Sequence, residues 1–374
     1  MKLLIVNLIL FTPEKGRIPR VDSIKDTMIY DLCLAGVKEG HEVTLYAADA
    51  YRPIQNEQYP FKIVWGICKC SKIFKPTALP YTPDLKKYMR EHGAEYDLII
   101  SSEVFSMASW ILTRTANNKL IVWHELAKHN RMMHKIPSKV WYNVIARFFF
   151  RKTCVVARSV EAREFIRQYC PDTQEQVIDH GVNLDLFQPI TRKKNYFVVC
   201  SQLIPRKQID GIILQFGKFV EKGHNDFKLY IIGEGEEETT LKTLVKNRNL
   251  EKQVLFTGKL THQDMIPYLA EAKGLLINTR QDNNMISIVE AIAVGTPILT
   301  TSVPNNASYI RKEELGIVQD QWTESDLEQL IQNNSEYTEN CMKYRMKLST
   351  QYRIRQFVEI GQKEQIKYEN SDSK

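Results

Sequence analysis

Residues 274–302 read GLLINTRQDNNMISIVEAIAVGTPILTTS, and they give the clearest sign of the fold class. The apolar residues 274–278 are typical of a buried strand, and a polar loop at 279–284 follows them. Residues 286–294 carry the spacing of a helix, with Asn283 or Asn284 as its predicted N-cap. Gly295-Thr-Pro297 then ends the helix ahead of a further strand at 297–301. A strand, a helix and a second strand in this order predict a parallel sheet with crossover helices.

The same alternation extends over the rest of the chain in two series. In the first half, strands are predicted at residues 3–10, 42–47, 61–66, 97–101, 120–124 and 153–157, with helices at 23–39 and 106–116. In the second half, strands are predicted at 196–201, 227–233, 253–257, 274–278 and 297–301, with helices at 208–221, 236–247, 263–271 and 286–294. A break at residues 181–195 separates the two series, so the chain is expected to form two doubly wound α/β domains.

The bulk composition agrees with a globular chain of two domains. With 374 residues, of which 43% are hydrophobic and 25% charged, a disordered or fibrous class is excluded. The expected domains are residues 1–188 and 189–345. A helical tail at 346–374 is expected to pack back on the first domain, with its end disordered. The apolar run at 3–10 is too short for a membrane span and lacks a small-residue cleavage site, so it is interpreted as a first strand.

The chain is mildly basic, with a formal net charge of +7. Most of the excess lies in the first half, which favours anionic partners such as phosphates or acidic lipid headgroups; scattered solubilising lysines explain it equally well. The seven cysteines include no paired C-x2-C arrangement, so we expect reduced thiols and no metal site.

Two acidic residues flank the predicted helix start in the opening stretch. Asp282 lies in the loop, and Glu290 lies eight positions on, within the helix. The amino end of a helix presents unpaired N–H groups and a positive dipole end, which suit a phosphate. Carboxylates accept paired hydrogen bonds from vicinal sugar hydroxyls, and loops at the carboxyl ends of strands bind ligands in doubly wound domains. An ordinary capping loop followed by an ordinary helical glutamate explains the same residues without a ligand.

The spacing of these residues resembles the signature of the retaining family 4 glycosyltransferases (glycosyl transferases group 1), in which Glu-x7-Glu precedes Ala-x-Ala-x-Gly-x-Pro. Here Asp282-x7-Glu290 precedes Ala291-Ile-Ala293-Val-Gly295-Thr-Pro297. Further pieces resemble the family in the same order: Gly40-His41-Glu42-Val43, Ile178-Asp-His-Gly181-Val-Asn183 with Phe187-Gln-Pro189, Ser201-Gln-Leu-Ile-Pro-Arg-Lys207, Ile231-Ile-Gly233-Glu-Gly235 and Phe256-Thr-Gly258. The resemblance covers about residues 1–320.

The resemblance implies a GT-B architecture, in which two Rossmann-like doubly wound parallel-sheet domains face a cleft and the second holds a nucleotide sugar. It implies that Glu290 binds the ribose hydroxyls and that Asp282 faces the donor sugar. Lys207 is then the cation that neutralises the leaving diphosphate. The backbone amides of residues 285–287 would receive that diphosphate. The other implied donor-binding residues are Gln202, Arg206, Gly233, Asn283, Asn284, Met285, Ile286 and Ser287.

The resemblance also implies a catalytic role for His124, which ends a predicted strand of the first domain and would approach the donor sugar. A histidine at this place is also explained by a structural role. The implied reaction retains the anomeric configuration and uses no protein nucleophile, cofactor or metal ion, because the donor phosphate takes the acceptor proton. The catalytic residues expected are therefore His124, Lys207 and Asp282.

Three positions depart from the family pattern. Asp282 replaces the first glutamate and is one methylene shorter, and Gln202 stands where the family has an arginine. Arg206, beside Lys207, is a candidate replacement for that missing cation. The glycine pair expected after the first strand is replaced by Pro13-Glu-Lys-Gly16-Arg-Ile-Pro-Arg20.

The acceptor is expected to meet the first domain. Residues 131–152 contain aromatic residues and no acidic residue, and their cations are Arg131, Lys135, Lys139, Arg147, Arg151 and Lys152. A basic aromatic helix of this kind either lies in a membrane surface or packs its aromatic residues into a core. Contact with the cytoplasmic face of a membrane through 131–152 would suit a glycan or lipid-linked acceptor, as in capsule, O-antigen or exopolysaccharide assembly. No nucleic-acid-binding module is visible.

Three alternative functions fit parts of the sequence. A partner subunit that binds a nucleotide sugar without catalysis would explain Asp282 and Gln202. Another GT-B enzyme, such as a sugar-nucleotide epimerase, would share the donor site. A dinucleotide-dependent oxidoreductase would use Gly233-Glu-Gly235, but the third glycine of its motif is absent and the acidic residues 236–238 would repel a pyrophosphate. The sequence favours a retaining hexosyl- or hexosaminyltransferase.

Overall fold

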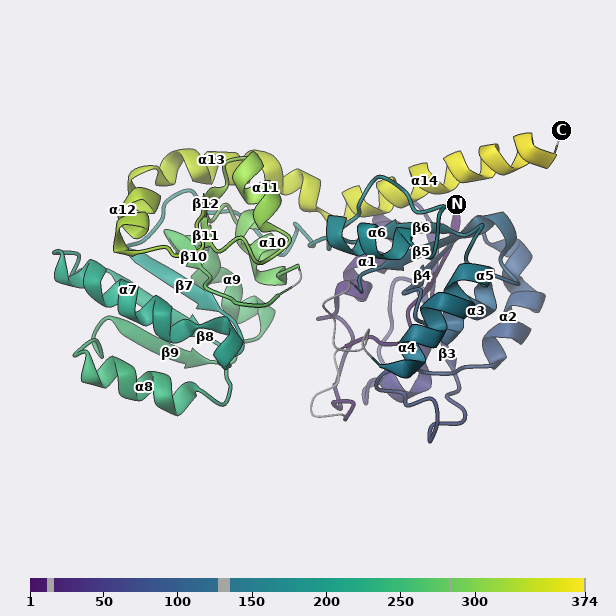
Figure 1. The fold of residues 1–374 in the computed structure, drawn as a ribbon, viewed down its shortest axis with the longest axis horizontal. Helices are drawn as coiled ribbons and strands as arrows, with labels where there is room; N and C mark the ends of the chain where they lie inside the picture. The colour runs from purple at the N-terminus through teal and green to yellow at the C-terminus, as the bar shows by residue number, and fades with distance from the viewer. Residues whose placement is uncertain (12–16, 127–134, 283, 373–374) are drawn as a thin grey trace. The chain divides into compact units, whose positions relative to one another are not determined.

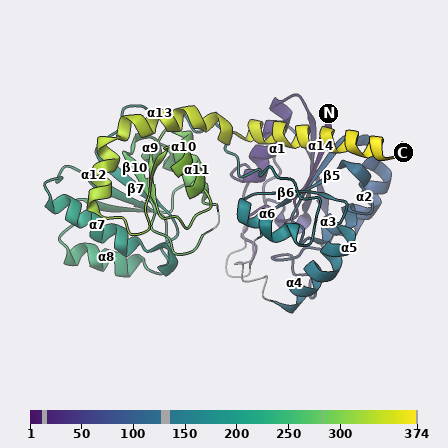
Figure 2. The same ribbon diagram turned by 45° about the horizontal axis from the view of Figure 1, so that its top comes forward.

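The chain forms two α/β units, which are described here from a computed structural model covering residues 1–11, 17–126, 135–282 and 284–372. The first unit is Met1–Gly181 together with Thr350–Lys374, and the second is Val182–Ser349. Each unit has its own sheet (Figure 1, Figure 2). Each unit also has its own buried apolar core. The chain therefore leaves the first unit near Gly181, before the boundary at 188 that the sequence suggested, and returns to it at Thr350.

The first unit contains a six-stranded sheet in which every neighbouring pair is parallel. In chain order its strands are β1 Lys2–Val6, β2 Glu42–Ala48, β3 Lys62–Gly66, β4 Leu98–Ser102, β5 Leu120–His124 and β6 Cys154–Ala157. Their spatial order is β3-β2-β1-β4-β5-β6. The central strand β1 is buried from Leu3 to Val6, as expected for a parallel strand covered on both faces. It ends at Val6 and not at the predicted residue 10.

Helices pack on both faces of this sheet (Figure 1). They are α1 Met28–Lys38, α2 Asp84–His92, α3 Met107–Leu112, α4 Ile136–Val140, α5 Arg147–Phe149, α6 Val160–Arg167 and α14 Thr350–Asp372. A π-helix, η5 Trp141–Ala146, joins α4 to α5, and short 3-10 turns lie at η1 Asp49–Tyr51, η2 Gly93–Glu95 and η3 Asn117–Lys119. The hydroxyl of Thr27 caps α1 by accepting from the amide of Tyr30, so this helix begins later than the predicted residue 23.

The last helix, α14, packs on the first unit. The guanidinium of Arg355 donates to both carboxylate oxygens of Glu39, at 2.6 and 2.8 Å. The amide of Gln365 donates to the carbonyl of Asp97 at 2.7 Å. The helix continues to Asp372, where the sequence suggested disorder from residue 369 onward.

The second unit repeats the plan of the first. Its parallel strands are β7 Tyr196–Cys200, β8 Lys228–Ile232, β9 Val254–Gly258, β10 Gly274–Leu276, β11 Ile298–Thr300 and β12 Gly316–Val318, in the spatial order β12-β11-β10-β7-β8-β9. Its helices are α7 Ile209–Glu221, α8 Glu238–Asn247, α9 His262–Glu271, α10 Ile286–Ala293, α11 Ala307–Lys312, α12 Glu324–Gln332 and α13 Asn334–Tyr344, with 3-10 turns η6 Pro205–Lys207 and η7 Arg345–Leu348. The strand β12 was not among those predicted.

The strand order identifies the fold class and the place where a ligand binds. Each sheet begins at its centre, grows to one side through its second and third strands, and then continues on the other side, which is the dinucleotide-binding order. The direction reverses between β1 and β4 in the first sheet and between β7 and β10 in the second. In such sheets ligands bind beyond the carboxyl ends of these two strands. The predicted pair of doubly wound parallel-sheet units is therefore confirmed.

Two further structural observations concern the membrane and the thiols. Across the described ranges, every helix is too short or too polar to span a bilayer. None of the seven cysteines, all of them described, forms a disulfide bond, and burial raises the pKa of several of them, including Cys170 to about 12.

Candidate functional site

A cluster of charged residues lies at the reversal point of the second sheet. Lys207 is the last residue of η6, the turn that follows β7, and Asp282 lies in the loop that follows β10. Because β7 and β10 are neighbouring parallel strands, their carboxyl ends lie at the same edge of the sheet. The sequence separates these residues widely, and the parallel pairing brings them together.

Both basic residues of η6 contact the same carboxylate oxygen. Lys207 Nζ and Arg206 Nη1 each form an ion pair with Asp282 Oδ2, and the Arg206 distance is 3.2 Å. The sequence left open whether Arg206 faces the same way as Lys207. The structure shows that it does.

The two loops that carry the cluster are held together by their backbones. The amide of Arg280 donates to the carbonyl of Arg206 at 2.8 Å, and the hydroxyl of Thr279 lies 3.2 Å from the same carbonyl oxygen. In return, Arg206 Nη1 donates to the carbonyl of Gln281 at 2.6 Å. These reciprocal bonds fix the position of Asp282 relative to both cations.

Both Lys207 and its partner Asp282 are largely buried, and this burial affects the pKa of the Lys207 ammonium. The side chain of Lys207 is 10% exposed and that of Asp282 is 16% exposed. Burial lowers the pKa of the Lys207 ammonium, and the adjacent Asp282 carboxylate acts in the opposite direction. A buried ammonium of this kind needs an anionic partner, and here the carboxylate supplies it. A phosphate group could take the same place.

The helix α10 begins beside this cluster, but its cap differs from the prediction. Its N-cap is Met285, so the prediction of Asn284 as N-cap is wrong, and Asn283 lies outside the described residues. The cap is supplied from a distant loop: Asn306 Oδ1 accepts from the amide of Met285 at 2.7 Å. A buried side chain from another segment thus replaces the local asparagine.

This cap changes which backbone amides are available at the start of α10. The amide of Met285 was expected to bind the diphosphate, and in this structure it is occupied by Asn306. The amides of Ile286 and Ser287 belong to the first turn of α10, where no intrahelical acceptor exists for them. These two remain the backbone donors at the helix start, while the side chain of Asn284 is half-buried just before it.

Glu290 lies in the middle of α10 and is 5% exposed. Burial raises the pKa of the Cys200 thiol well above its usual range, and the negative charge of Glu290 raises it further. The carboxylate of Glu290 is therefore close to Cys200, the last residue of β7. Glu290 thus approaches the same sheet edge as Lys207 and Asp282.

The turn after β8 completes this edge of the sheet. Gly233 has a φ of +141°, and a Cβ atom there would lie 1.9 Å from the carbonyl oxygen of Ser201. Only glycine allows β8 to pass this close to the end of β7. Gln202, by contrast, is exposed and stands apart from the ion pairs. Ser201 has a buried hydroxyl without a hydrogen-bond partner among the described residues, a feature that sequence reasoning missed.

His124 belongs to the first unit, while the other candidate residues belong to the second. Its side chain is fully buried at the end of β5, with Nδ1 2.9 Å from Glu103 Oε2. Its ring stacks against Phe165, with centroids 6.4 Å apart. A sugar could contact this imidazole only after the ring became accessible, so a catalytic role for His124 stays a prediction.

A second ionic group at the same edge of the first sheet was missed in the sequence. Arg158, which follows β6, pairs with Glu125 at 3.0 Å, and His180 lies 3.6 Å from the same carboxylate. Burial alone would raise the pKa of Glu125, but Arg158 and His180 outweigh it and hold that pKa at about 2. The carboxylate of Glu103 accepts from the amide of Glu125 at 2.8 Å. Glu103 also has a φ of +68°, a value that is uncommon for residues other than glycine.

The basic segment 131–152 has two distinct faces. Residues 131–134 lie outside the described residues, and α4, η5 and α5 cover residues 136–149. Trp141, Tyr142 and Phe150 pack into the core, with Trp141 Nε1 donating to the carbonyl of Val104. The opposite face carries an exposed apolar stripe at every fourth position, with Ile136 77% exposed, Val140 54%, Val144 46% and Phe148 72%.

The glycine pair of the family pattern cannot be compared directly, because residues 12–16 lie outside the described residues. Within the described ranges, no three His, Cys, Asp or Glu side chains gather as metal ligands would.

Two doubly wound units, with acidic and basic side chains gathered at the reversal point of the second, define an α/β protein of GT-B architecture. The chain belongs to the family 4 glycosyltransferases: residues 26–186 match the family described as Glycosyltransferase Family 4, and residues 185–349 match the family described as Glycosyl transferases group 1. The expected membership of this retaining family is confirmed, as is its GT-B fold.

Several known proteins are similar to this chain in sequence or in structure. N-acetyl-alpha-D-glucosaminyl L-malate synthase of Bacillus anthracis is 24% identical over 55% of this chain and 45% of its own length. An O-antigen biosynthesis glycosyltransferase of Escherichia coli is 24% identical over 62% of this chain and 67% of its own length. The structure of Anabaena HepE in complex with UDP matches with a TM-score of 0.67 at 16% identity, covering 96% of this chain and 99% of that one. This chain spans about half the length of the first of these relatives.

Proposed function

We propose that this protein transfers a sugar from a nucleotide-diphosphate sugar, with retention of configuration, to a glycan or lipid-linked glycan acceptor. The observation that carries the proposal is the convergence of Lys207 and Arg206 on Asp282 beside the first turn of α10. Two cations and the first-turn amides of a helix at a sheet reversal point are suited to a diphosphate. The bound UDP in the similar Anabaena structure supports the same class of ligand.

The donor would replace an internal ion pair. A diphosphate entering this edge would take Asp282's place as the partner of Lys207 and Arg206, since both cations need an anion in a partly buried site. The carboxylate of Asp282 would then be released toward the sugar hydroxyls. Glu290, further along α10, would accept hydrogen bonds from the ribose hydroxyls.

Catalysis would follow from placing charge where the leaving group develops it. As the glycosidic bond breaks, negative charge grows on the diphosphate, and a fixed ammonium at Lys207 stabilises the transition state more than the ground state. The acceptor hydroxyl attacks from the same face, and the departing phosphate takes its proton. The protein contributes positioning and electrostatics, and no side chain forms a covalent bond.

The acceptor side of the proposal rests on the exposed stripe of α4–α5. Five cations of the described part of this segment, Lys135, Lys139, Arg147, Arg151 and Lys152, accompany the stripe, and no acidic residue lies among them. An apolar stripe with basic neighbours suits a membrane surface with anionic lipids. A lipid-linked acceptor in envelope polysaccharide assembly would be presented at such a surface. The similar O-antigen biosynthesis glycosyltransferase of Escherichia coli supports this context.

A thermal-shift panel of UDP-, GDP- and ADP-sugars tests the donor site. A ligand that binds only the folded protein stabilises it by about 2.7 kcal/mol at one hundred times its Kd, so the matching donor raises the Tm. The Glu290→Gln variant is expected to lose this shift. The variant Glu251→Gln, which changes an exposed glutamate at the end of the α8–β9 connection, should keep it. A full shift in Glu290→Gln would contradict the proposed site.

Measured transfer separates the proposal from a non-catalytic partner subunit. The wild-type protein, with Asp282 in place of the family's glutamate, is expected to form a glycosidic product with retained configuration when donor and acceptor are supplied. Donor binding without any product, in both the wild type and Asp282→Glu, would instead identify a binding subunit. Hydrolysis to free sugar without acceptor-dependent product would identify an epimerase-type GT-B enzyme.

A further inference from the structure

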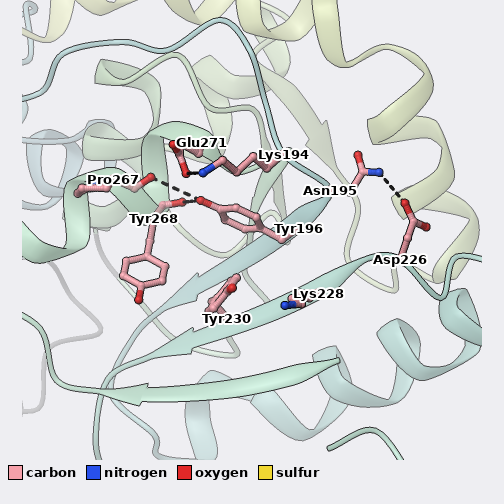
Figure 3. Close-up of a pocket in the computed structure, with 9 residues that line it drawn as sticks. All are labelled: Lys194, Asn195, Tyr196, Asp226, Lys228, Tyr230, Pro267, Tyr268 and Glu271. Atoms are coloured by element: carbon pink, nitrogen blue, oxygen red, sulfur yellow. Dashed lines mark hydrogen bonds and ion pairs between the residues drawn. The ribbon is translucent and has the colours of Figure 1, made fainter. Parts of the chain in front are cut away.

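An open hollow of about 520 Å³ lies at the opposite edge of the second sheet from the donor site (Figure 3). Its floor is formed where β7 and β8 begin, at Tyr196 and Lys228, and one wall is the last turn of α9. Lys207, by contrast, follows the carboxyl end of β7. At about 3.3 Å per residue, the five residues of β7 place the hollow about 16 Å from the donor edge. The hollow is therefore a separate site.

Three tyrosine side chains form the apolar part of the hollow. Tyr196 and Tyr230 meet edge to face with centroids 5.0 Å apart, and Tyr230 meets Tyr268 in the same manner at 5.1 Å. Tyr196 is buried, and its hydroxyl donates to the carbonyl of Tyr268 at 3.0 Å, which ties β7 to α9. Tyr230 and Tyr268 are half-buried, and Figure 3 draws no interaction on their hydroxyls with the other residues shown. Both residues line the hollow.

The rim of the hollow is polar and its charges balance. Asn195 Nδ2 donates to Asp226 Oδ2 at 2.6 Å, and Lys194 pairs with Glu271 at 2.5 Å. Lys228 lies between these two pairs along the first residues of β8, as Figure 3 shows. Two carboxylates thus offset two ammonium groups around the hollow. Lys194, Asn195 and Asp226 are exposed, and Glu271 is half-buried.

This chemistry discriminates between classes of ligand. A phosphate or a nucleotide would gain no net electrostatic attraction, because the two carboxylates offset the two ammonium groups. A purely apolar ligand would leave four charged groups desolvated without partners. A neutral saccharide fits both the tyrosine cluster and the polar rim. Its C–H faces pack on tyrosine rings, and its hydroxyls hydrogen-bond to carboxylate, amide and ammonium groups.

We propose that this hollow is a saccharide-binding subsite that holds a segment of a glycan away from the reacting end. This subsite rests on the proposed function only for the identity of the bound glycan, which would be the acceptor or its extended product. A second contact on the same chain raises the local concentration of the acceptor at the donor edge, because binding at one site tethers the glycan near the other.

The test uses the full chain and soluble oligosaccharides of glucose, mannose and N-acetylglucosamine as probes. Binding is measured by ligand-observed NMR and by titration calorimetry in the absence of any nucleotide sugar. The wild type is expected to bind at least one of these probes. Tyr268→Ala and Asp226→Ala are each expected to raise its Kd about tenfold, the equivalent of about 1.4 kcal/mol. Asp226 is exposed and pairs only at the rim, so that variant is expected to keep its fold.

Matched controls separate this site from the donor site. Tyr352→Ala, which removes a partly exposed tyrosine of α14, should leave saccharide binding unchanged. The Tm shift caused by a nucleotide sugar should be the same in Tyr268→Ala, Asp226→Ala and the wild type. Saccharide binding without any nucleotide-sugar shift would leave the subsite in place and contradict the proposed function. The subsite is overturned if the wild type binds no probe, if neither variant weakens binding, or if inorganic phosphate displaces the saccharide.

Discussion

Lys207 and Asp282 form an ion pair at the carboxyl edge of the second sheet although 75 residues separate them in the sequence. The pair exists because β7 and β10 are parallel neighbours at the point where the strand order reverses. Arg206 joins it through the same carboxylate oxygen. The carboxylate thus holds both cations at one point, where we propose that the diphosphate of the donor binds.

Removing the ammonium of Lys207 is expected to affect catalysis more than folding. The Lys207→Ala variant should lower kcat by about 100-fold to 1,000-fold, the range observed when one preorganised charge or donor on a leaving group is lost. Steady-state transfer assays measure this effect. Lys246→Ala, which removes an exposed lysine of α8, provides the matched control and should retain full activity. A Lys207→Ala enzyme within about twofold of the wild type would remove this residue from the mechanism.

The distant cap of α10 predicts a stability effect at Asn306. Its side chain is buried, accepts from the amide of Met285 and donates to the hydroxyl of Tyr309 at 3.0 Å. Asn306→Ala leaves that amide without a partner, so the free energy of unfolding should fall by about 1–3 kcal/mol in a urea titration. The neighbouring change Asn305→Ala, at a less buried position, should cost much less. Equal losses in the two variants would contradict the capping role.

The close approach of β8 and β7 predicts a strong penalty at Gly233. A Cβ atom there would overlap the backbone carbonyl of Ser201, and the residue also has a positive φ. Gly233→Ala is expected to destabilise the second unit by about 3 kcal/mol or more. Gly223 has a φ of +109° but open space around its Cβ position, so Gly223→Ala isolates the backbone strain and should cost about 1 kcal/mol. The two costs would be similar if the overlap at Ser201 were absent.

The ion pair of Arg158 and Glu125 predicts a stability change at low pH. The pKa of Glu125 is about 2 in the folded protein against an ordinary value of 4.5. A lowered folded pKa means that the pair stabilises the protein above pH 4.5, and that this contribution disappears as the pH falls toward 2. Glu125→Gln should therefore cost about 2 kcal/mol in urea unfolding at neutral pH, and the cost should shrink toward pH 2. Glu175→Gln, which changes a glutamate 80% exposed in its ion pair with Arg167, should cost little at any pH.

The exposed stripe of α4–α5 predicts binding to anionic membranes. The wild type should co-sediment with phosphatidylglycerol vesicles, and more weakly at high salt, because screening reduces the attraction of its cations. Replacing Ile136, Val140, Val144 and Phe148 together with serine should reduce binding at least tenfold, since the apolar area that inserts is lost. Ile366→Ser, an exposed isoleucine on α14, is the control and should not change binding. Unchanged binding in the fourfold variant would contradict the membrane contact.

Local sequence pattern was enough to predict the regular elements. The strand at residues 120–124 was predicted with the bounds that β5 has, and most other strands differ by one or two residues. The reason is that a strand buried on both faces is a continuous apolar run, and a helix has its own period, so both can be recognised without knowledge of their neighbours. The strand β12 was missed because its three residues are too few to form a recognisable apolar run.

The sequence by itself determined two doubly wound units, because the periodicity of apolar residues records each strand and helix. Its resemblance to the family 4 glycosyltransferases supplied the candidate donor residues. Only the tertiary structure decided how those residues meet. The orientation of Arg206 beside Lys207, the cap that Asn306 gives to α10, the burial of His124 against Glu103, and the outward stripe of α4–α5 all depend on partners brought together by packing. Contacts between segments far apart in the chain leave no local periodicity, so no short stretch of sequence contains them.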